Sequence, residues 1–272
     1  MDPPPLASLS LTHVYYDPDD RLSLLCAYLA LIPQALCIVY ATLFFSTREV
    51  EIALLFAGQV GCEALNLALK RLFKEDRPEA RLRGKGYGMP SSHAQFLAFW
   101  SLSLALFLLV RHRPRPSPPS SSSSSSSTAT SPQPQSQPHN CRWPLPHRAL
   151  VSAAALALSA LTAWSRVYLG YHSPRQVLAG SVAGFLSAAV WFRLTAWLRR
   201  SGRLAWALDL RPARALRLRD LVVYEDLCQA GWEKWERERR RRTTTTGFEG
   251  FMTLLPSSFT KLRQLSHSSQ FE

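Results

Sequence analysis

Three short segments of this sequence combine basic residues, serines and histidines in a way that suits phosphate chemistry. They read KRLFKEDRP at residues 70–78, PSSH at 90–93 and SRVYLGYHSPRQ at 165–176. Arginine holds phosphate oxygens through two parallel hydrogen bonds, and lysine adds a point charge. Lys70, Arg77 and Arg166 are therefore candidates for an anion cage, although each alone is better explained as a basic side chain at a helix end.

Two histidines accompany these cations. His93 closes the PSSH segment, where Ser91 is expected to cap a helix and the backbone amides near Ser92 to face a bound anion. His172 follows Arg166 in the third segment. One histidine would be a surface residue as readily as a reactive one, but two histidines, three cations and a helix N-terminus on one face are hard to explain as packing and indicate a phosphate site.

Five apolar stretches position these segments, at residues 22–45, 50–69, 93–110, 149–164 and 177–198. A helix of such residues crosses about 30 Å of hydrocarbon, so the predicted fold is an all-α, polytopic membrane helix bundle with five transmembrane helices. Each motif lies at the end of a span, and the alternation of spans puts all three on the membrane side of the N-terminus. We expect no cleaved signal peptide, because acidic residues precede the first span.

Composition and charge argue against nucleic-acid binding and metal sites, and they also indicate the orientation in the membrane. The net charge of +13 would suit a nucleic-acid partner in a soluble protein, but no stacking platform or groove-binding helix accompanies it, so none is predicted. The cysteines lack the spacing of a metal site, and no carboxylate cluster occurs in the motifs, so neither metal nor other cofactor is expected. The side opposite the motifs carries Arg111 and Arg148 with no acidic residue between them, and the positive-inside rule makes that side cytoplasmic.

The chain divides into six predicted regions. They are a lumenal N-terminus (1–21), three spans with two motifs (22–113), a disordered Ser/Pro-rich cytoplasmic loop (114–138), two spans with the third motif (139–200), a cytoplasmic, interfacial helical tail (201–242) and a disordered end (243–272). The Ser/Pro-rich loop cannot bury a core. The tail mixes apolar and charged residues at helical spacing and contains tryptophans, which favours the membrane interface.

The three segments resemble the signature of the type 2 phosphatidic acid phosphatase superfamily. The matches are Lys70, Arg77 and Pro78 to its Lys-x6-Arg-Pro element, Pro90, Ser91 and His93 to Pro-Ser-Gly-His, and Ser165, Arg166 and His172 to Ser-Arg-x5-His-x3-Asp. Two positions depart from the pattern: Ser92 replaces Gly, and Gln176 replaces the Asp that orients the nucleophilic histidine.

Within that superfamily the chain is similar to the dolichyldiphosphatases, through residues 87–96 and 165–176, over a region of about residues 11–242 without the Ser/Pro-rich loop. The resemblance implies hydrolysis of a polyprenyl pyrophosphate lipid, dolichyl diphosphate, to dolichyl phosphate and phosphate. It also implies an endoplasmic reticulum membrane enzyme that acts on the lumenal face and recycles the carrier for protein N-glycosylation. No protein partner is predicted.

The resemblance also implies a role for each site residue. His172 attacks the terminal phosphorus to form a phosphohistidine, and His93 protonates the departing oxygen. The phosphate oxygens are held by Lys70, Arg77, Ser91, Ser92 and Arg166. Gln176 orients the nucleophile but brings no negative charge, so either the site is slower or another group supplies the charge; a phosphate leaving group eases the demand.

A polar stripe follows one face of the second predicted span. Its members are Gln59, Glu63, Asn66 and Lys70, at spacings of four, three and four residues. A carboxylate inside a membrane is a functional candidate, and a structural pairing with a neighbouring helix explains Glu63 equally well.

Three other functions are alternatives for this sequence. The chain could be a superfamily phosphatase for phosphatidate or a sphingoid phosphate, which only a panel of substrates would distinguish. It could be a non-catalytic lipid-phosphate binder or transporter, although binding alone does not require both His93 and His172. A relationship to vanadium haloperoxidases is disfavoured by the membrane spans.

Overall fold

The structure is a computed structural model that describes residues 7–9, 14–78, 86–112, 144–228 and 230–239. The chain forms two compact units, residues 1–225 and 226–272. Among the described residues, five helices are long and apolar enough to cross a membrane, and all five belong to the first unit. The prediction of an all-α bundle with five spans is thus confirmed, and the chain is a multi-pass membrane protein.

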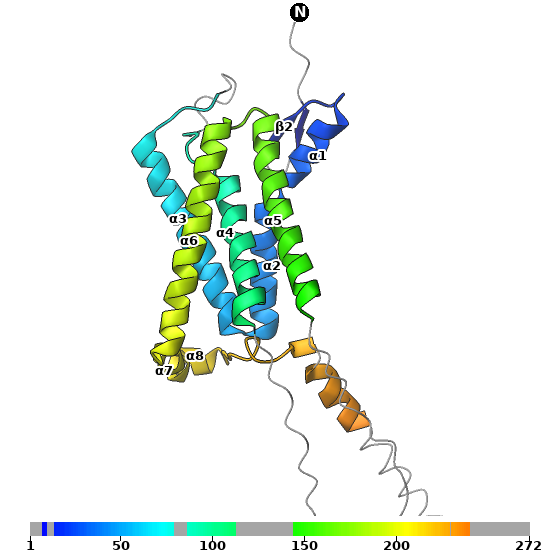
Figure 1. Cartoon of the computed structure of the whole chain (residues 1–272), viewed down its shortest axis with the longest axis vertical. Coiled ribbons are helices and arrows are strands. Elements are labelled where there is room, and N and C mark those ends of the chain that lie inside the picture. The colour runs from blue at the N-terminus through cyan, green and yellow to red at the C-terminus, as the bar shows by residue number, and fades with distance from the viewer. Residues whose placement is uncertain (1–6, 10–13, 79–85, 113–143, 229, 240–272) are drawn as a thin grey trace, which may run out of the picture. The chain divides into compact units, whose positions relative to one another are not determined.

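The spans are α1 (Arg21–Leu29) followed by α2 (Ile32–Thr47), α3 (Val50–Phe73), α4 (Ser92–Leu106) with its π-helical continuation η2 (Phe107–Arg111), α5 (Leu145–Tyr168) and α6 (Pro174–Arg200). Successive spans run in opposite directions, so the ends of α3 and α5 meet the starts of α4 and α6 (Figure 1). An antiparallel hairpin of β1 (Ala7–Leu9) and β2 (Val14–Tyr16) lies at that same end.

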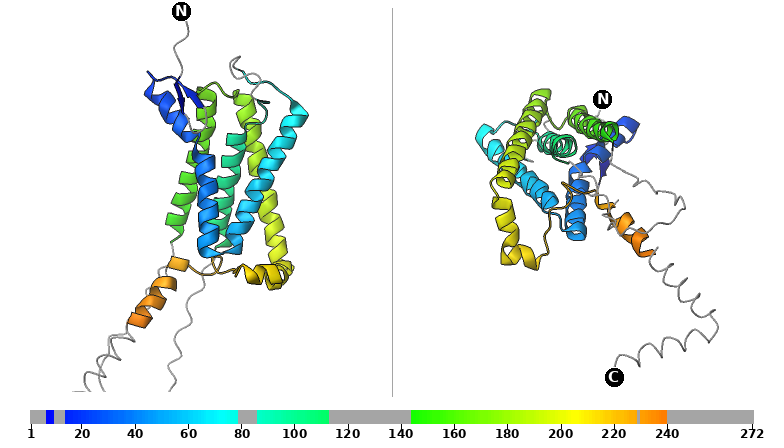
Figure 2. Two further views of the ribbon diagram at one scale, coloured as in Figure 1. Left: turned by 180° about the vertical axis from the view of Figure 1, so that it is seen from behind. Right: turned by 60° about the horizontal axis from the view of Figure 1, so that its bottom comes forward.

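Helix α4 lies at the centre of the bundle, as the tilted view in Figure 2 shows. It packs on α2, α3, α5 and α6. Two glycines of α6 permit the closest approach: a Cβ at Gly180 would lie 2.5 Å from the Ser91 carbonyl oxygen, and one at Gly184 would lie 2.3 Å from that of Gln95. Backbone contact with α6 therefore holds the PSSH segment against the third motif.

The first span is broken, where the sequence predicts one continuous helix. Helix α1 ends at Leu29 and α2 begins at Ile32, with Pro33 in the first turn of α2. A proline there loses no hydrogen bond, because the first amides of a helix have no intrahelical partner. Asp20 starts α1 by accepting from the amides of Leu22 (2.9 Å) and Ser23 (3.1 Å).

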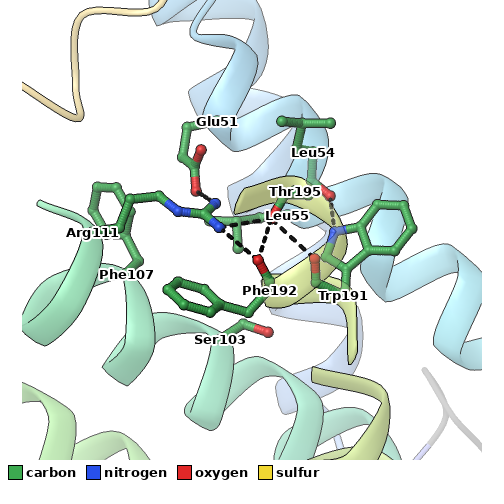
Figure 3. Close-up of a pocket in the computed structure, with 9 residues that line it drawn as sticks. All are labelled: Glu51, Leu54, Leu55, Ser103, Phe107, Arg111, Trp191, Phe192 and Thr195. Atoms are coloured by element: carbon green, nitrogen blue, oxygen red, sulfur yellow. Dashed lines mark hydrogen bonds and ion pairs between the residues drawn. The ribbon is translucent and has the colours of Figure 1, made fainter. Parts of the chain in front are cut away.

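Ion pairs close the end of the bundle opposite the motifs. Glu51 on α3, which is 1% exposed, pairs with Arg111 and Arg199, and Arg199 also pairs with Asp220. Arg111 further donates to the Phe192 carbonyl (3.1 Å) and Thr195 Oγ1 (2.7 Å), as Figure 3 shows. The sequence suggests topology signals and membrane-surface contacts for the basic residues on this side, whereas Arg111 pairs with a buried carboxylate.

Beyond α6 the described part of the chain contains further helices. In the first unit these are α7 (Arg203–Asp209) and α8 (Arg211–Ala215), and the second unit contains a helix over residues 230–239. The predicted disordered regions, 114–138 and 243–272, lie outside the described residues. The division of the chain into lumenal and cytoplasmic regions stays a prediction.

Candidate active site

The three motif segments meet at one end of the bundle. The Ser91 amide donates to the Gln176 carbonyl (3.1 Å), and the Gly88 amide donates to the Glu75 carbonyl (2.6 Å). Lys70, in the last turn of α3, places Nζ 3.5 Å from Ser92 Oγ at the start of α4. The structure therefore brings the predicted site residues of the first two segments beside those of the third.

Arg166 is a buried cation with unused donors. Its side chain is 2% exposed, and Nε and Nη1 have no hydrogen-bond partner among the described residues. The guanidinium lies over the Tyr171 ring at 4.1 Å, and Arg77 lies 6.0 Å from the same ring. A buried charge without a carboxylate or other acceptor is costly, so this arrangement suits an anionic ligand that completes it.

Ser91 behaves differently from the expectation that it caps α4. It occupies the N-cap position, but its hydroxyl makes no capping bond, and its fully buried Oγ is unpartnered among the described residues. Its backbone amide donates to the Gln176 carbonyl, and Gly180 of α6 lies close to its backbone carbonyl. A buried hydroxyl left free is available to donate to a ligand oxygen.

His172 is buried and held by the backbone that follows Arg166. Its side chain is 3% exposed, and its amide donates to the Arg166 carbonyl (3.2 Å). Burial lowers the pKa of His172 to about 3, and the positive charges of Arg166, Arg77 and Lys70 act in the same direction. The imidazole is therefore neutral near pH 7 and keeps a lone pair, as a nucleophile requires.

His93 points its Nε2 at the carbonyl of Ala30, 3.1 Å away. Ala30 lies in the break between α1 and α2, so the irregular backbone that sequence periodicity missed supplies the contact that orients this ring. For His93 to protonate a leaving group, it must use Nδ1 or release Ala30. The predicted acid is thus in the site but is not yet aligned for transfer.

Arg77 also lies at the cage. It is half-buried, its Nε donates to the Gly86 carbonyl (3.3 Å), and burial lowers its pKa. Among the described residues, none of the ion pairs involves Lys70, Arg77 or Arg166. Three cations without carboxylate partners at one membrane end leave their charge for a ligand.

Gln176 joins the nucleophile to a carboxylate that the sequence analysis did not select. Gln176 Oε1 is 3.3 Å from His172 Nδ1, while its Nε2 donates to Glu75 Oε1 (2.8 Å) and to the Asp76 carbonyl (2.9 Å). Acidic residues inside the otherwise basic segment 70–78 are the one signal that could have pointed to Glu75. Glu63, the carboxylate considered from sequence, has a buried Oε1 without a partner among the described residues.

The rest of the polar stripe on α3 pairs with α4. Gln59 Nε2 donates to the Phe96 carbonyl (3.3 Å), and Asn66 Nδ2 donates to Gln95 Oε1 (2.8 Å). These buried amides hold α3 and α4 together, so the structural explanation of the stripe applies to them. Lys70, one turn beyond Asn66, continues the same face into the site.

The N-terminal elements contact two tyrosines of the third motif segment. The Tyr15 amide donates to the Tyr171 hydroxyl (2.8 Å), and the Tyr168 hydroxyl donates to Asp20 Oδ2 (2.7 Å). The bond from Tyr168 lowers the pKa of Asp20. Strand β2 is thereby tied to Tyr171, which stacks on Arg166, and the N-cap of α1 is tied to Tyr168; neither contact is indicated by the sequence.

In the part of the chain that the structure describes, no three His, Cys, Asp or Glu side chains are grouped as they would be around a metal ion. Catalysis without a metal stays a prediction that chelation can test.

Comparison with known proteins agrees with this arrangement. A family model described as "PAP2 superfamily" matches residues 51–200. A Neurospora crassa protein named "Putative dolichyldiphosphatase" is 55% identical over 267 residues, which cover 88% of this chain and 94% of that protein. The Saccharomyces cerevisiae dolichyldiphosphatase is 30% identical over 221 residues (77% of this chain, 79% of that one). Human dolichyldiphosphatase 1 is 34% identical over 191 residues (69% and 71%).

No solved structure matches the chain significantly. The helical bundle, its three converging motifs and the family match define the class: the chain belongs to the PAP2 superfamily. Within that superfamily it groups with the proteins named dolichyldiphosphatase.

Proposed function

We propose that this phosphatase hydrolyses dolichyl diphosphate to dolichyl phosphate and inorganic phosphate. The observation that carries the proposal is Arg166, a buried guanidinium whose Nε and Nη1 lack acceptors. Lys70, Arg77, Ser91 and Ser92 lie in the segments that meet there. A terminal phosphate, with three peripheral oxygens and high charge, is the ligand class that satisfies such donors. The names of the related proteins support dolichyl diphosphate as the lipid.

The reaction proceeds in two displacements. In the first, His172 Nε2 forms a bond to the terminal phosphorus while the bond from that phosphorus to the bridging oxygen breaks. Dolichyl phosphate departs, and His93 gives a proton to the departing oxygen. In the second, water attacks the phosphohistidine, His93 takes back a proton, and phosphate leaves with His172 free. Splitting the displacement avoids a direct attack by water, and general acid assistance contributes about 10² to 10⁴-fold.

The cage stabilises the transferring group. In a loose transition state, charge spreads over the peripheral phosphate oxygens, and fixed cations in a buried site act on that charge without reorganising. The low pKa of His172, about 3, keeps the nucleophile unprotonated while the site is empty. A protein that only binds lipid phosphate does not need a buried neutral imidazole beside the cage.

The membrane placement is part of the proposal. The motif end of the bundle, with the N-terminus, faces the lumen of the endoplasmic reticulum, and the Ser/Pro-rich loop and basic tail face the cytoplasm, in keeping with the arginine asymmetry. Hydrolysis on that face would recycle the carrier released by N-glycosylation. A glycosylation acceptor inserted near Gly86 should be modified in microsomes, and one inserted in the loop 114–138 should not.

The experiment that tests the activity is a substrate panel. Purified protein in detergent should release phosphate from dolichyl diphosphate with a higher kcat/KM than from dolichyl phosphate or phosphatidate. A preference for phosphatidate would replace the proposed substrate by another of the same superfamily. Absence of hydrolysis of all three lipids by folded protein would contradict the proposal.

A further inference from the structure

The Gln176 amide connects the nucleophile to Glu75, and we infer that Glu75 is a positioning residue that acts on His172 through this amide. The inference rests on the proposed function of His172 as nucleophile. It addresses the departure from the superfamily pattern at position 176, where an amide stands in place of a carboxylate. The missing negative charge is supplied from the first motif segment, one hydrogen bond further away.

The orientation of the Gln176 amide is fixed by its neighbours on both sides. Its nitrogen donates to two acceptors, Glu75 Oε1 (2.8 Å) and the Asp76 carbonyl (2.9 Å). Its oxygen accepts from the Ser173 amide (3.3 Å) and faces His172 Nδ1 at 3.3 Å. Exchanging the two ends would place oxygen against a carboxylate and a carbonyl, and nitrogen against an amide N–H.

This orientation determines the tautomer of His172. Since Gln176 Oε1 only accepts, His172 Nδ1 must carry the proton, and Nε2 must carry the lone pair. The ring therefore presents the correct nitrogen to phosphorus without a carboxylate in contact. Without Glu75, the amide loses one of the acceptors that holds it in place, and the opposite tautomer becomes accessible.

The charge of Glu75 matters as well as its geometry. When Nε2 bonds to phosphorus, the ring that still carries a proton on Nδ1 becomes positive. A carboxylate at the far end of the amide polarises the two hydrogen bonds in series and stabilises that charge. Because Coulomb energy falls with distance, the effect should be smaller than that of the direct carboxylate of a catalytic triad, where the exchange of Asp for Asn costs about 10⁴-fold.

Gly88 lies against the Gln176 amide, and its lack of a side chain leaves room for that amide. A Cβ at Gly88 would lie 2.8 Å from Gln176 Nε2, 2.9 Å from Oε1 and 3.0 Å from the Asp76 carbonyl oxygen. The atoms that would be displaced first are the ends of a flexible side chain. Gly88→Ala thus offers a way to move the amide while Glu75 remains.

The alternative is a purely structural role, in which Gln176 serves only as a helix cap. Its oxygen does accept from Ser173, and Ser173 Oγ accepts from the Gln176 amide, which together form a capping box at the start of α6. A cap does not require an ionised partner at Glu75. The two explanations therefore differ in what removal of the Glu75 charge alone does to turnover.

The test uses steady-state kinetics of the full chain in detergent with dolichyl diphosphate. Glu75→Gln keeps an acceptor for Gln176 and removes only the charge, so kcat should fall about 10- to 100-fold while KM stays near the wild-type value, because the cage is unchanged. Asp19→Asn removes an exposed negative charge near the same end of the bundle and should leave kcat unchanged. An unchanged kcat in Glu75→Gln would overturn the inference.

A charge exchange separates positioning from a merely structural role. Gln176→Asp alone brings a second carboxylate against Glu75 and removes the donor, so it should lower kcat. In Glu75→Gln/Gln176→Asp the carboxylate contacts His172 directly and the new amide donates to it, so kcat should recover to at least the wild-type value. Failure of the double variant to exceed both single variants would overturn the inference.

Two further measurements apply if Glu75→Gln does not fold or if the proposed substrate is wrong. If Glu75→Gln does not fold, as judged by thermal unfolding, Gly88→Ala should show the same loss of kcat at constant KM, and wild-type turnover in that variant would overturn the inference. Failure of the proposed function has another signature: the wild-type protein would hydrolyse a different lipid phosphate. The same variants assayed on that lipid would still decide the role of Glu75.

Discussion

The two ends of the bundle both bury arginine, but they satisfy it differently. At the end without motifs, Arg111 donates to Glu51, to a backbone carbonyl and to a hydroxyl. At the motif end, Arg166 is more deeply buried, yet it contacts an aromatic ring and leaves two donors unpaired among the described residues. The difference distinguishes an arginine that holds the fold together from one that is prepared for a ligand.

The comparison has a thermodynamic consequence. Removing one partner of a buried carboxylate weakens its compensation, so breaking the Arg111 pair should destabilise the protein even though Arg199 still pairs with Glu51. Removing Arg166 relieves a charge that the empty protein does not neutralise, so it should cost activity and little stability.

The largest effect is expected at Arg166. Arg166→Ala should lower kcat/KM by at least about 10² to 10³-fold, the usual cost of one donor to transition-state charge, and the temperature of unfolding without substrate should not fall. The measurement is phosphate release together with thermal unfolding in detergent. Substantial activity in the folded variant would show that Arg166 does not bind the transferring phosphate.

The opposite pattern is expected at Arg111. Arg111→Ala should destabilise the protein by about 1 to 3 kcal/mol, because one oxygen of the buried Glu51 would lose its partner while Arg199 stays paired with the other. The fraction that stays folded should hydrolyse substrate with a near-normal KM. Arg200→Ala, on the exposed face of α6, is the matched control and should change neither property. Equal stability of Arg111→Ala and the control would contradict the structural role.

A pH effect should distinguish the wild-type protein from the charge-exchange variant. Attack requires unprotonated Nε2, and with a pKa of about 3 His172 stays reactive well below pH 6. A carboxylate in contact with the ring favours imidazolium and raises that pKa. The ratio of kcat in Glu75→Gln/Gln176→Asp to kcat in wild type should therefore fall as the pH is lowered from about 7 to 5.

Taking the ratio removes the titration of the substrate, which is common to both proteins. A ratio that stayed constant across that interval would mean that the introduced carboxylate does not reach His172.

The smallest effect is expected from chelation. EDTA should leave hydrolysis of dolichyl diphosphate unchanged, because cations of the cage take the electrostatic role that a metal plays in other phosphatases. The motivating observation is that Lys70, Arg77 and Arg166 lie in the segments that meet at the site. Complete loss on chelation, with recovery on adding magnesium, would replace this part of the mechanism.

Much of the fold could be predicted because hydrocarbon imposes strict requirements on sequence. A chain in a bilayer must satisfy its backbone internally, so long apolar stretches predict helices and their alternation brings the three motifs to one end. The same reasoning failed at Ala30. The residues around the break in the first span are as apolar as those of a continuous helix, and Pro33 is compatible with either.

The finer parts of the site depend on how helices are rotated against each other. Gly180 and Gly184 allow the close approach of α6 to α4, and at that contact the Ser91 amide donates to the Gln176 carbonyl. The contact from Gln176 to Glu75 joins residues 101 positions apart. In sequence, Glu75 is one acid among basic neighbours, and only the packed structure shows which side chain it meets.

If His172 carries the phosphoryl group during the reaction, the phosphohistidine can be trapped on the protein. Dolichyl diphosphate labelled in its terminal phosphate would be mixed with excess protein, quenched within one turnover in alkali, and the bound label mapped by mass spectrometry. We expect alkali-stable, acid-labile label on His172 of the wild-type protein and no label on the His172→Ala variant. Labelled phosphate released in the first turnover without label on the protein, or with label on another residue, would contradict it.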